Sequence, residues 1–321
     1  MKFIAEFCQN HLGNEELLWR MIDEAKDAGA THAKIQGLYS EELVYRSEYE
    51  DGSGKAGGLV RPFGPETERL SGLDLSFEIE EEFVRRCAVA GITPMTTVFS
   101  HRGAERAISA GFTSFKIASY DCASLPLIGK ILPHATDLVV STGATDWKDV
   151  KNTSDFLKNE AREGTWIAFL HARTIYPTPL EEFRLPRMVS LLSFGFDVGL
   201  SDHSSPAKDG LDASKAAIWL GASAVERHFT VLSPSETKDG PVSVNPAQLR
   251  ELVAFSSADS QDQLPIIQQI LEKTPEAMLC PSLDPDDAER VSALYYRGRV
   301  ASWHGSNQVF AWEKWPADAE I

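Results

Sequence analysis

The stretch Val198-Gly199-Leu200-Ser201-Asp202-His203-Ser204 begins with apolar residues and then switches abruptly to polar, ionisable ones. Residues 222–230, Ala-Ser-Ala-Val-Glu-Arg-His-Phe-Thr, repeat the same switch. A buried parallel strand that ends in ionisable groups is typical of a barrel enzyme, which carries its chemistry at the carboxyl ends of its strands. The two stretches therefore predict neighbouring barrel strands with His203 and His228 at their ends.

These two histidines are candidate ligands of one divalent metal ion. Imidazole is a common metal ligand, and two rings offered from neighbouring strand ends can reach the same ion. The alternative is that both are core histidines whose rings are hydrogen-bonded within the protein. The polar residues at the other strand ends favour the metal site.

Short apolar runs alternate with longer amphipathic segments along most of the chain. The predicted strands are residues 2–7, 32–36, 93–99, 114–117, 137–141, 166–170, 197–200 and 224–226. The predicted helices are residues 15–28, 77–90, 103–110, 124–132, 147–160, 182–192, 208–220 and 246–255. This alternation predicts a parallel sheet with right-handed crossovers, and eight repeats in about 250 residues match a (β/α)8 TIM barrel. A doubly wound sheet is the alternative, but residues 7–13 do not fit the phosphate-binding pattern GxGxxG.

Two parts are expected: a barrel domain over residues 1–256 and a C-terminal extension over residues 257–321. In the extension, residues 264–271 and 286–294 have a helical pattern. The short irregular tail that follows carries Trp303, Trp312 and Trp315, and we expect it to pack on the barrel or on a second subunit.

Residues 38–74 form a long irregular insertion after the second strand. Its glycine-rich centre, residues 51–58, has no side chains with which to build a packed core and is expected to be mobile. A long loop after a barrel strand is often a lid over the site, and the alternative is an insertion without function.

Composition narrows the possible partners and compartments. The 321 residues include 31 basic and 47 acidic ones, giving a net charge of −16, which argues against binding to nucleic acid or an anionic membrane. The four cysteines are far apart, with no CxxC, which suits a reducing cytoplasm. We find no signal peptide at the N-terminus and no apolar run long enough to span a membrane, so a cytoplasmic location is expected.

Two lysines at strand ends suggest a binding site for an anion. Lys34 and Lys116 follow buried strands, where an ammonium group is costly unless it is paired with an anion. With Ser119 and the turn Ser141-Thr142-Gly143 they form a plausible phosphate pocket, because hydroxyls and backbone N–H groups supply directed donors. The alternative for each lysine is a buried salt bridge to Glu6 or Asp121.

Several of these motifs together resemble the sialic acid synthases, which condense phosphoenolpyruvate with an N-acetylated amino sugar. The matching motifs are Ile4-Ala5-Glu6 with Asn10-His11, Lys34-Ile35-Gln36, Phe115-Lys116-Ile117-Ala118-Ser119, Val140-Ser141-Thr142-Gly143, Ile175-Tyr176-Pro177-Thr178-Pro179, Gly199-Leu200-Ser201-Asp202-His203 and Glu226-Arg227-His228-Phe229-Thr230. Their order and spacing hold from residue 3 to about residue 255, roughly four-fifths of the chain.

The resemblance implies roles for individual residues. His203 and His228 would bind a divalent ion, Mn²⁺ or Mg²⁺, and Glu6 would be the acidic residue beside the reacting carbons. Phosphoenolpyruvate would be held by Lys34, Thr97, Lys116, Ser119, Ser141 and Ser201, and the sugar would be faced by Gln36, Tyr176 and Asp239. A homodimer is also implied.

The chain departs from the family pattern mainly on the sugar side. Asp121 stands where the family often has Glu, Thr174 where it usually has Asn, and Arg173 adds a positive charge near the mouth of the site. A C-terminal antifreeze-like domain, common in the family, and the usual N-terminal extension are expected to be absent. The insertion or the tryptophan-rich tail would then close the site.

These observations predict a metal-dependent transferase that forms a carbon–carbon bond. It would condense phosphoenolpyruvate with an amino-sugar aldehyde resembling N-acetylmannosamine, and release a sialic acid-type 2-keto sugar acid and phosphate. Two alternatives remain: a metal-dependent aldolase or lyase on the same barrel that uses free pyruvate, and a non-catalytic paralogue that binds a sugar phosphate.

Overall fold

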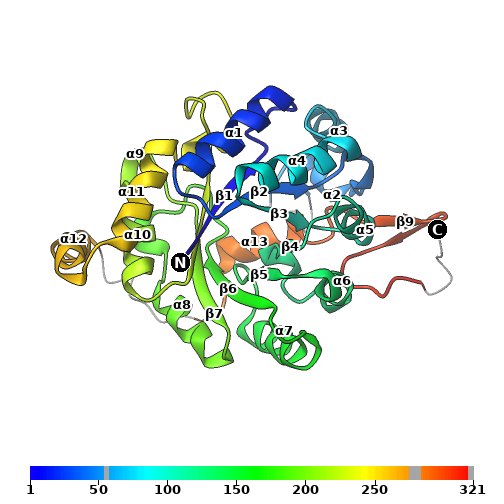
Figure 1. Cartoon of the computed structure of the whole chain (residues 1–321). Helices are drawn as coiled ribbons and strands as arrows, with labels where there is room; N and C mark the ends of the chain where they lie inside the picture. The colour runs from blue at the N-terminus through cyan, green and yellow to red at the C-terminus, as the bar shows by residue number, and fades with distance from the viewer. Residues whose placement is uncertain (54–57, 275–282, 317–321) are drawn as a thin grey trace.

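The computed structural model describes residues 1–53, 58–274 and 283–316, and its centre is a closed barrel of eight parallel strands (Figure 1). The strands are β1 (Lys2–Cys8), β2 (His32–Gly37), β3 (Thr93–Val98), β4 (Ser114–Ile117), β5 (Asp137–Ser141), β6 (Trp166–Ala172), β7 (Asp197–Asp202) and β8 (Ala224–His228). Each pairs with the next along the chain, and β8 closes the ring on β1. The predicted (β/α)8 barrel is confirmed.

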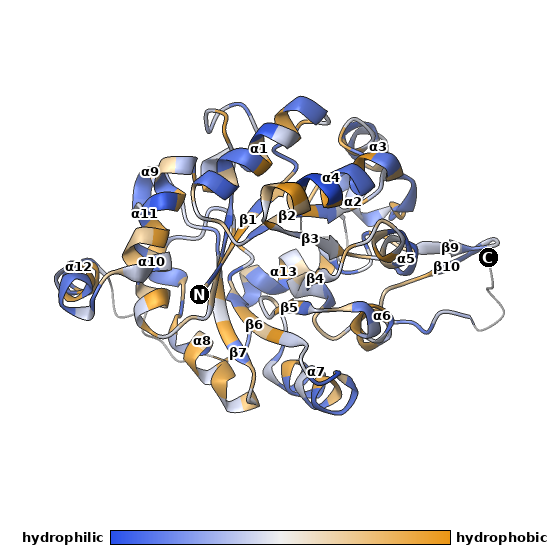
Figure 2. Ribbon diagram, in the orientation of Figure 1, coloured by the Kyte–Doolittle hydropathy of each residue, from blue (hydrophilic) through white to orange (hydrophobic). Residues whose placement is uncertain are grey.

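Helices surround the barrel. The helices that connect its strands are α1 (Glu15–Asp27), α4 (Phe77–Ala90), α5 (His101–Ser109), α6 (Leu125–Ile131), α7 (Trp147–Glu160), α8 (Pro186–Leu191) and α10 (Asp212–Trp219), and α11 (Pro246–Ser257) follows β8. Their apolar faces turn toward the strands and their polar faces toward solvent (Figure 2). This is the amphipathic pattern that the sequence analysis used.

The element boundaries differ from the prediction in two informative places. The predicted helix 208–220 is divided into α9 (Pro206–Asp209) and α10, because Gly210 has a φ of +60° that a continuous helix does not allow. Strands β6, β7 and β8 each run two residues further than predicted. Most of the added residues are polar but still belong to the hydrogen-bonded ladder, and two of them, Ser201 and His228, line the cavity at the end of the barrel.

The core has two layers. Inside the barrel lies a small cluster, Ile4, Met95, Val139, Leu170 and Ala224, and a larger apolar layer fills the space between strands and helices. Gly199 belongs to the inner wall, where an added Cβ would lie 2.1 Å from the carbonyl oxygen of Ala224. A side chain at this position would therefore force β7 away from β8.

The insertion and the C-terminal extension lie against each other. The insertion contains the 3-10 turn η1 (Ser40–Glu42), α2 (Glu48–Asp51) and α3 (Phe63–Ser71), and the extension contains α12 (Ser260–Lys273), α13 (Asp287–Tyr296) and the hairpin β9 (Ser302–His304) and β10 (Asn307–Val309). Leu43 bridges to Val300, and buried Glu42 accepts hydrogen bonds from Ser100 and Ser302. Of the glycine-rich centre predicted to be mobile, residues 54–57 lie outside the described residues.

The tryptophan-rich tail packs on the barrel. The Trp315 ring lies 5.4 Å from the ring of His101, the first residue of α5. The hairpin in this tail has no periodic signal in the sequence, because its two strands have three residues each. In Figure 1, α13 lies behind the strands, near the middle of the ring.

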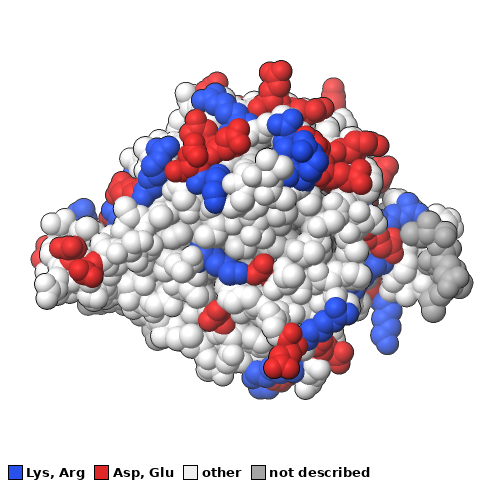
Figure 3. Space-filling view, in the orientation of Figure 1, with Lys and Arg blue, Asp and Glu red and all other residues white. Residues whose placement is uncertain are grey.

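Acidic and basic side chains intermingle on the face of the molecule shown in Figure 3, chiefly over α1 and α4. Glu82 on α4, for example, is ion-paired with both Arg85 and Arg86. Among the helices that the structure describes, none combines the length and the apolar character that a membrane crossing requires.

Candidate active site

A cavity of about 390 Å³ opens at the carboxyl ends of the barrel strands. It is lined by most of the residues that the sequence analysis placed at the site: Glu6, Lys34, Gln36, Thr97, Lys116, Ser119, Asp121, Ser141, Thr174, Tyr176, Ser201, His203, His228 and Asp239. Thr142 and Gly143 of the expected phosphate pocket do not line it, and the Thr142 hydroxyl instead accepts a hydrogen bond from Arg187. Side chains of a strand alternate between its two faces, so residues two positions apart, such as Glu226 and His228, point the same way into the barrel. The structure thus brings the predicted set together, and the roles of its members remain predictions.

Four charged side chains form the floor of this cavity. The ammonium group of Lys34 contacts Glu6 and lies 3.3 Å from Glu226, and the ammonium group of Lys116 contacts the other oxygen of Glu226. All four side chains are at least nine-tenths buried. The salt bridge from Lys34 to Glu6, which the sequence analysis gave as the alternative to a phosphate pocket, is present. Lys116 pairs with Glu226, which the sequence analysis had not assigned to the site. We call Glu6, Lys34, Lys116 and Glu226 the cavity floor.

The surroundings shift the pKa values of the two floor lysines in opposite directions. Burial would lower the pKa of Lys34, but the carboxylates of Glu226 and Glu6 outweigh it and raise that pKa. Burial lowers the pKa of Lys116, because the attraction of Glu226 does not offset it and Lys34 repels the charge. Burial would raise the pKa of Glu226, but Lys116 and Lys34 hold it well below its ordinary value. Lys116 is therefore the ammonium that gains most from an additional negative charge.

Hydroxyl groups surround the floor. Thr97 Oγ1 accepts a hydrogen bond of 2.9 Å from Lys34, and Ser201 Oγ donates one of 2.7 Å to Glu226. Ser141 Oγ is buried and has no hydrogen-bond partner among the described residues. Gly143 lets its turn lie against Ser119, since an added Cβ would come within 3.0 Å of Ser119 Oγ. This combination of ammonium and hydroxyl donors is suited to a phosphate or carboxylate ligand.

The histidine pair lies beside the floor. The ring centroids of His203 and His228 are 5.6 Å apart, and both rings are buried. Nδ1 of His203 lies 2.8 Å from the carbonyl oxygen of Arg173, which can only accept, so Nδ1 carries the proton and Nε2 is the acceptor nitrogen of the ring. Tyr176 Oη lies 3.0 Å from that Nε2.

These rings fit the requirements of a divalent metal ion. Burial and the neighbouring His228 lower the pKa of His203 to about 3, so its ring is neutral, as a metal ligand must be. Nδ1 of His228 is buried without a hydrogen-bond partner in the described part of the chain. An orphaned buried nitrogen is costly unless something binds it. The alternative of two fully hydrogen-bonded core histidines therefore does not describe His228.

A buried ion pair holds the ends of β7 and β8 together. Asp202 and Arg227 precede the two histidines, point out of the barrel by strand alternation, and approach to 2.5 Å. Ser204 and Ser214 also donate hydrogen bonds to Asp202, and Ser204 accepts one from Arg227. The pair thus fixes the backbone from which both imidazoles project.

Arg173 does not add a charge to the mouth, contrary to the sequence-based expectation. Its side chain is 1 % exposed and is ion-paired with Glu289 and Asp286 at the start of α13. Glu289 also accepts hydrogen bonds of 3.3 Å from the backbone N–H groups of Ala144 and Thr174. The arginine therefore attaches the C-terminal extension to the barrel, a role that depends on a partner more than 100 residues away.

Asp121 lies at the edge of the cavity. Burial raises the pKa of its carboxyl group to about 7, because a hydrogen bond from Ser124 and the charge of Arg297 offset that burial only in part. Its side chain is thus a candidate for proton exchange near neutral pH.

The outer wall of the cavity comes from the insertion and the C-terminal extension. We give this name to Leu38, Arg61, Arg69, Tyr296, Arg299 and Trp312, all of which line the cavity. Arg69 and Arg299 share the single carboxylate of Glu66, so the wall carries an excess of positive charge. Lys238, in the loop after β8, also lines the cavity and adds to this excess. The positive electrostatic potential of the outer wall favours the entry of anions into the cavity.

Sequence reasoning missed two kinds of residue. Glu226 and Cys8 could have been found, because each lies two positions from a chosen residue, His228 and Glu6, on the cavity-facing side of a strand. Arg299 and the other wall residues carry no comparable signal, since no periodic pattern places them at the cavity.

Known proteins resemble this chain in sequence and in fold. A family model described as the NeuB family matches residues 21–261. The N,N'-diacetyllegionaminic acid synthase of Campylobacter jejuni is 28% identical over 253 residues, covering 78% of this chain and 73% of that protein. The pseudaminic acid synthase of the same organism is 29% identical over 261 residues, covering 80% and 73%. A solved structure of an N-acetylneuraminic acid synthetase from Leptospira borgpetersenii has the same fold, with a TM-score of 0.65, 24% identity and coverage of 91% of this chain and 90% of that one.

Proposed function

We propose, since this chain belongs to the NeuB family, that it condenses phosphoenolpyruvate with an amino-sugar aldehyde resembling N-acetylmannosamine. The products would be a sialic acid-type 2-keto sugar acid and inorganic phosphate. The observation that carries this proposal is that Lys34 and Lys116 meet on the floor of the same cavity that holds the histidine pair. An anion-binding group and a candidate metal site therefore lie side by side.

The phosphoenolpyruvate end would lie over the cavity floor. Charge-assisted hydrogen bonds from two ammonium groups are strong enough to hold a phosphate against competition from water. The residues proposed to bind this substrate are Lys34, Thr97, Lys116, Ser119, Ser141 and Ser201. The lowered pKa of Lys116 supports its role, because a bound phosphate would supply the compensating charge that Glu226 alone does not.

The reaction forms a carbon–carbon bond and a carbon–oxygen bond to water, and it breaks the carbon–oxygen bond to phosphate. The two protons of the water end on the former aldehyde oxygen and on the released phosphate. Carbon 3 of the enol attacks the aldehyde carbon, positive charge develops at carbon 2, water adds there, and phosphate leaves by C–O cleavage. Glu6 and Glu226 place carboxylates beside this region, where they can stabilise the developing positive charge and accept the proton of the water.

His203 and His228 would hold the divalent ion, for which Mn²⁺ and Mg²⁺ are the proposed candidates. When bound, the ion supplies Lewis-acid polarisation of the aldehyde oxygen. Two protein nitrogens leave positions free for a substrate oxygen and water. Arg173 fixes the His203 ring through its carbonyl oxygen and so presents Nε2 to the cavity.

The sugar would lie between the histidine pair and the outer wall, facing Gln36, Tyr176 and Asp239. Tyr176 is half exposed at the mouth, where it can contact a ligand and solvent together. The named relatives make different acids, legionaminic and pseudaminic. The proposal therefore specifies an amino-sugar aldehyde as a class.

The test is a product-mass screen. The purified protein is incubated with phosphoenolpyruvate, Mn²⁺ and a panel of N-acetylated hexosamines, and both released phosphate and product mass are measured. We expect phosphate and a 2-keto acid in equal amounts, and loss of both in a chelator. Product formed from free pyruvate without phosphate release would instead indicate the aldolase alternative. Calorimetric binding of phosphoenolpyruvate without any turnover would indicate the non-catalytic alternative.

A further inference from the structure

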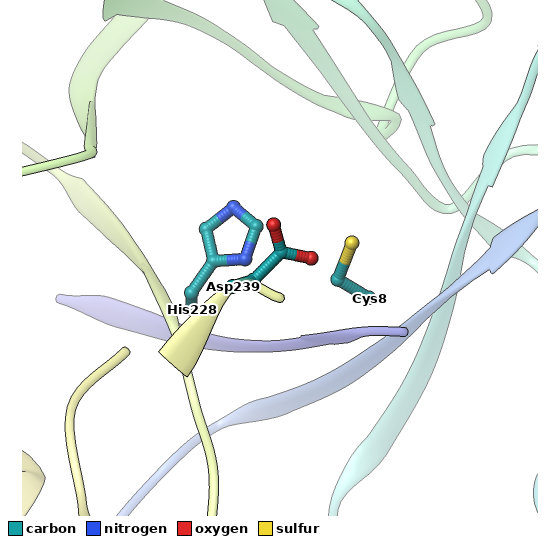
Figure 4. A group of neighbouring side chains, drawn as sticks. All are labelled: Cys8, His228 and Asp239. Atoms are coloured by element: carbon teal, nitrogen blue, oxygen red, sulfur yellow. The ribbon is translucent and has the colours of Figure 1, made fainter. Parts of the chain in front are cut away.

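Three potential metal ligands, one of which is His228 of the histidine pair, lie close together in the cavity. The family resemblance implies a metal-binding role for His228 alone among them. Cys8, His228 and Asp239 each offer one ligand atom, and these atoms all lie within 4.8 Å of one another. In Figure 4 the imidazole, the carboxylate and the thiol face one another. Cys8 and His228 are buried, and Asp239 is partly buried.

The three residues come from adjacent parts of the barrel. Cys8 is the last residue of β1 and His228 the last of β8, and these strands pair so that Glu6 lies opposite His228. Asp239 follows in the loop after β8, just before the 3-10 turn η7 (Gly240–Val242). The pairing of β1 with β8 therefore sets the distance between the thiol and the imidazole.

The backbone directs the Cys8 side chain into the cavity. The register of β1 against β2 shifts between Glu6 and Cys8, and Cys8 has a φ of +46°. Its N–H group donates a hydrogen bond of 2.7 Å to Glu6 Oε1, which holds this bulge in place. Bulges next to active sites commonly re-aim a side chain, and here Cys8 lines the cavity.

An independent observation shows that one nitrogen of this cluster has no hydrogen-bond partner among the described residues. His228 is 6 % exposed, yet its Nδ1 has no hydrogen-bond partner among the described residues. A buried imidazole nitrogen without a partner costs free energy that a bound cation would recover. The orphaned nitrogen belongs to the same ring that Cys8 and Asp239 approach.

We propose that Cys8 and Asp239 join His228 as protein ligands of the divalent ion in this chain. The inference rests on the proposed function, which places an ion at the two histidines. A thiolate ligand selects ions that accept sulfur, such as Zn²⁺, Fe²⁺ and Co²⁺, over Mg²⁺, which prefers oxygen. The site would therefore discriminate against Mg²⁺.

The test uses Co²⁺ as a spectroscopic probe of the full-length protein. A cobalt–thiolate bond gives a ligand-to-metal charge-transfer band in the near ultraviolet, which imidazole and carboxylate ligands do not give. We expect this band in the unmodified protein and its loss in Cys8→Ser and Cys8→Gly, with Co²⁺ affinity lowered by roughly tenfold or more in both. Cys8→Gly is included because glycine adopts a positive φ without strain, so that variant should keep the backbone of the bulge.

Cys87→Ala is the matched control, because Cys87 is buried on α4 away from the cavity lining. It should keep the band. Absence of the band in the unmodified protein, or its persistence in Cys8→Ser, would overturn the assignment of Cys8. Neither result would contradict the proposed function, because phosphate release and its loss in a chelator test that function separately.

Discussion

The residues of the cavity floor belong to the hydrogen-bonded strands of the closed barrel. The residues of the outer wall belong to the insertion and the C-terminal extension, two segments that lie far apart in the sequence. On the floor, Lys34 lies opposite Glu6 on β1 and Met95 on β3 in the parallel ladder of the barrel. In the wall, Arg299 is attached through Glu66 and α13 through Arg173. The floor is thus fixed by the backbone ladder of the barrel, whereas the wall is held by ion pairs, two small apolar clusters and a few backbone hydrogen bonds, such as the one from the Ala301 N–H group to the Glu42 carbonyl oxygen.

This difference has a physical consequence. Shifting one floor residue requires breaking the ladder of the barrel, while opening the wall requires the loss of ion pairs, small apolar clusters and a few backbone hydrogen bonds. Elements held by few contacts open locally at lower free energy than a core sheet does. We therefore expect substitutions on the floor to affect chemistry and substitutions in the wall to affect local stability.

The largest expected effect is on turnover, from a change in the histidine pair beside the cavity floor. His228→Ala should lower turnover by about a thousandfold or more, because Lewis-acid assistance contributes several kcal/mol to the transition state. The fold should be unchanged, since the ring does not support the core. The measurement is phosphate release with and without a chelator, alongside thermal unfolding. His134→Ala, at an exposed histidine, is the control, and full activity of His228→Ala in a chelator would contradict the metal role.

The variant Glu289→Ala tests how α13, which carries part of the outer wall, is attached to the barrel. The change would leave the guanidinium of Arg173 buried with only part of its compensating charge, at a cost of about 3–5 kcal/mol. We expect α13 to open locally, so hydrogen exchange of its amides should accelerate while that of β1 to β8 stays unchanged. Asp287→Ala removes an exposed carboxylate from the same helix and should change exchange little. Equal acceleration in strands and α13 would mean that floor and wall unfold as one unit.

The pH dependence of stability tests the contact between insertion and hairpin. Burial raises the pKa of Glu42 to about 7, although hydrogen bonds from Ser100 and Ser302 partly offset it. Between the ordinary value of 4.5 and about 7, the folded protein holds a proton that the unfolded chain releases. The free energy of unfolding therefore falls as pH rises through this window, by up to about 3 kcal/mol from this group.

Glu42→Gln should remove that contribution. Urea unfolding at a series of pH values should show the variant gaining stability relative to the unmodified protein as pH rises from about 4.5 to 8. Glu41→Gln, at the exposed neighbouring residue, should leave the pH profile unchanged. Parallel profiles for Glu42→Gln and the unmodified protein would show that the buried carboxyl titrates normally.

Lys116→Ala returns to the floor and has the smallest of these expected effects. A charge-assisted hydrogen bond contributes roughly 1.5–3 kcal/mol, so the KM for phosphoenolpyruvate should rise about ten- to a hundredfold. Lys34 still compensates Glu226 in the variant, so the fold should be retained. Initial rates over a range of substrate concentrations give the constant, with the exposed Lys151→Ala as control. An unchanged KM would make Lys116 a structural residue.

The floor could be predicted from the sequence because strand alternation is local. Apolar runs located all eight strands, and the polar residues at their ends were necessarily close to one another once the sheet closed into a barrel. The site residues Lys34, Lys116 and His203 follow from this rule alone. Their exact partners did not, since Glu226 could be paired with Lys116 only after the register was known.

The wall could not be predicted in the same way. Arg173 was expected to charge the mouth, and only the position of α13 shows that it is neutralised and buried. The hairpin β9–β10 is too short to show a period, and its attachment depends on Glu42 across a separation of 260 residues. Such contacts are specified by tertiary packing, which no local pattern encodes.

The cavity floor contains two cationic and two anionic side chains, and the pKa of Lys116 is lowered within it. An incoming polyanion adds negative charge without displacing any, so it stabilises the protonated form of this amine. Association should then take up protons from the surrounding buffer, increasingly so at alkaline pH. Binding enthalpies measured by calorimetry in buffers with different ionisation enthalpies would give the number of protons taken up. They would therefore show the protonation state of Lys116 in the unliganded protein without any catalytic assay.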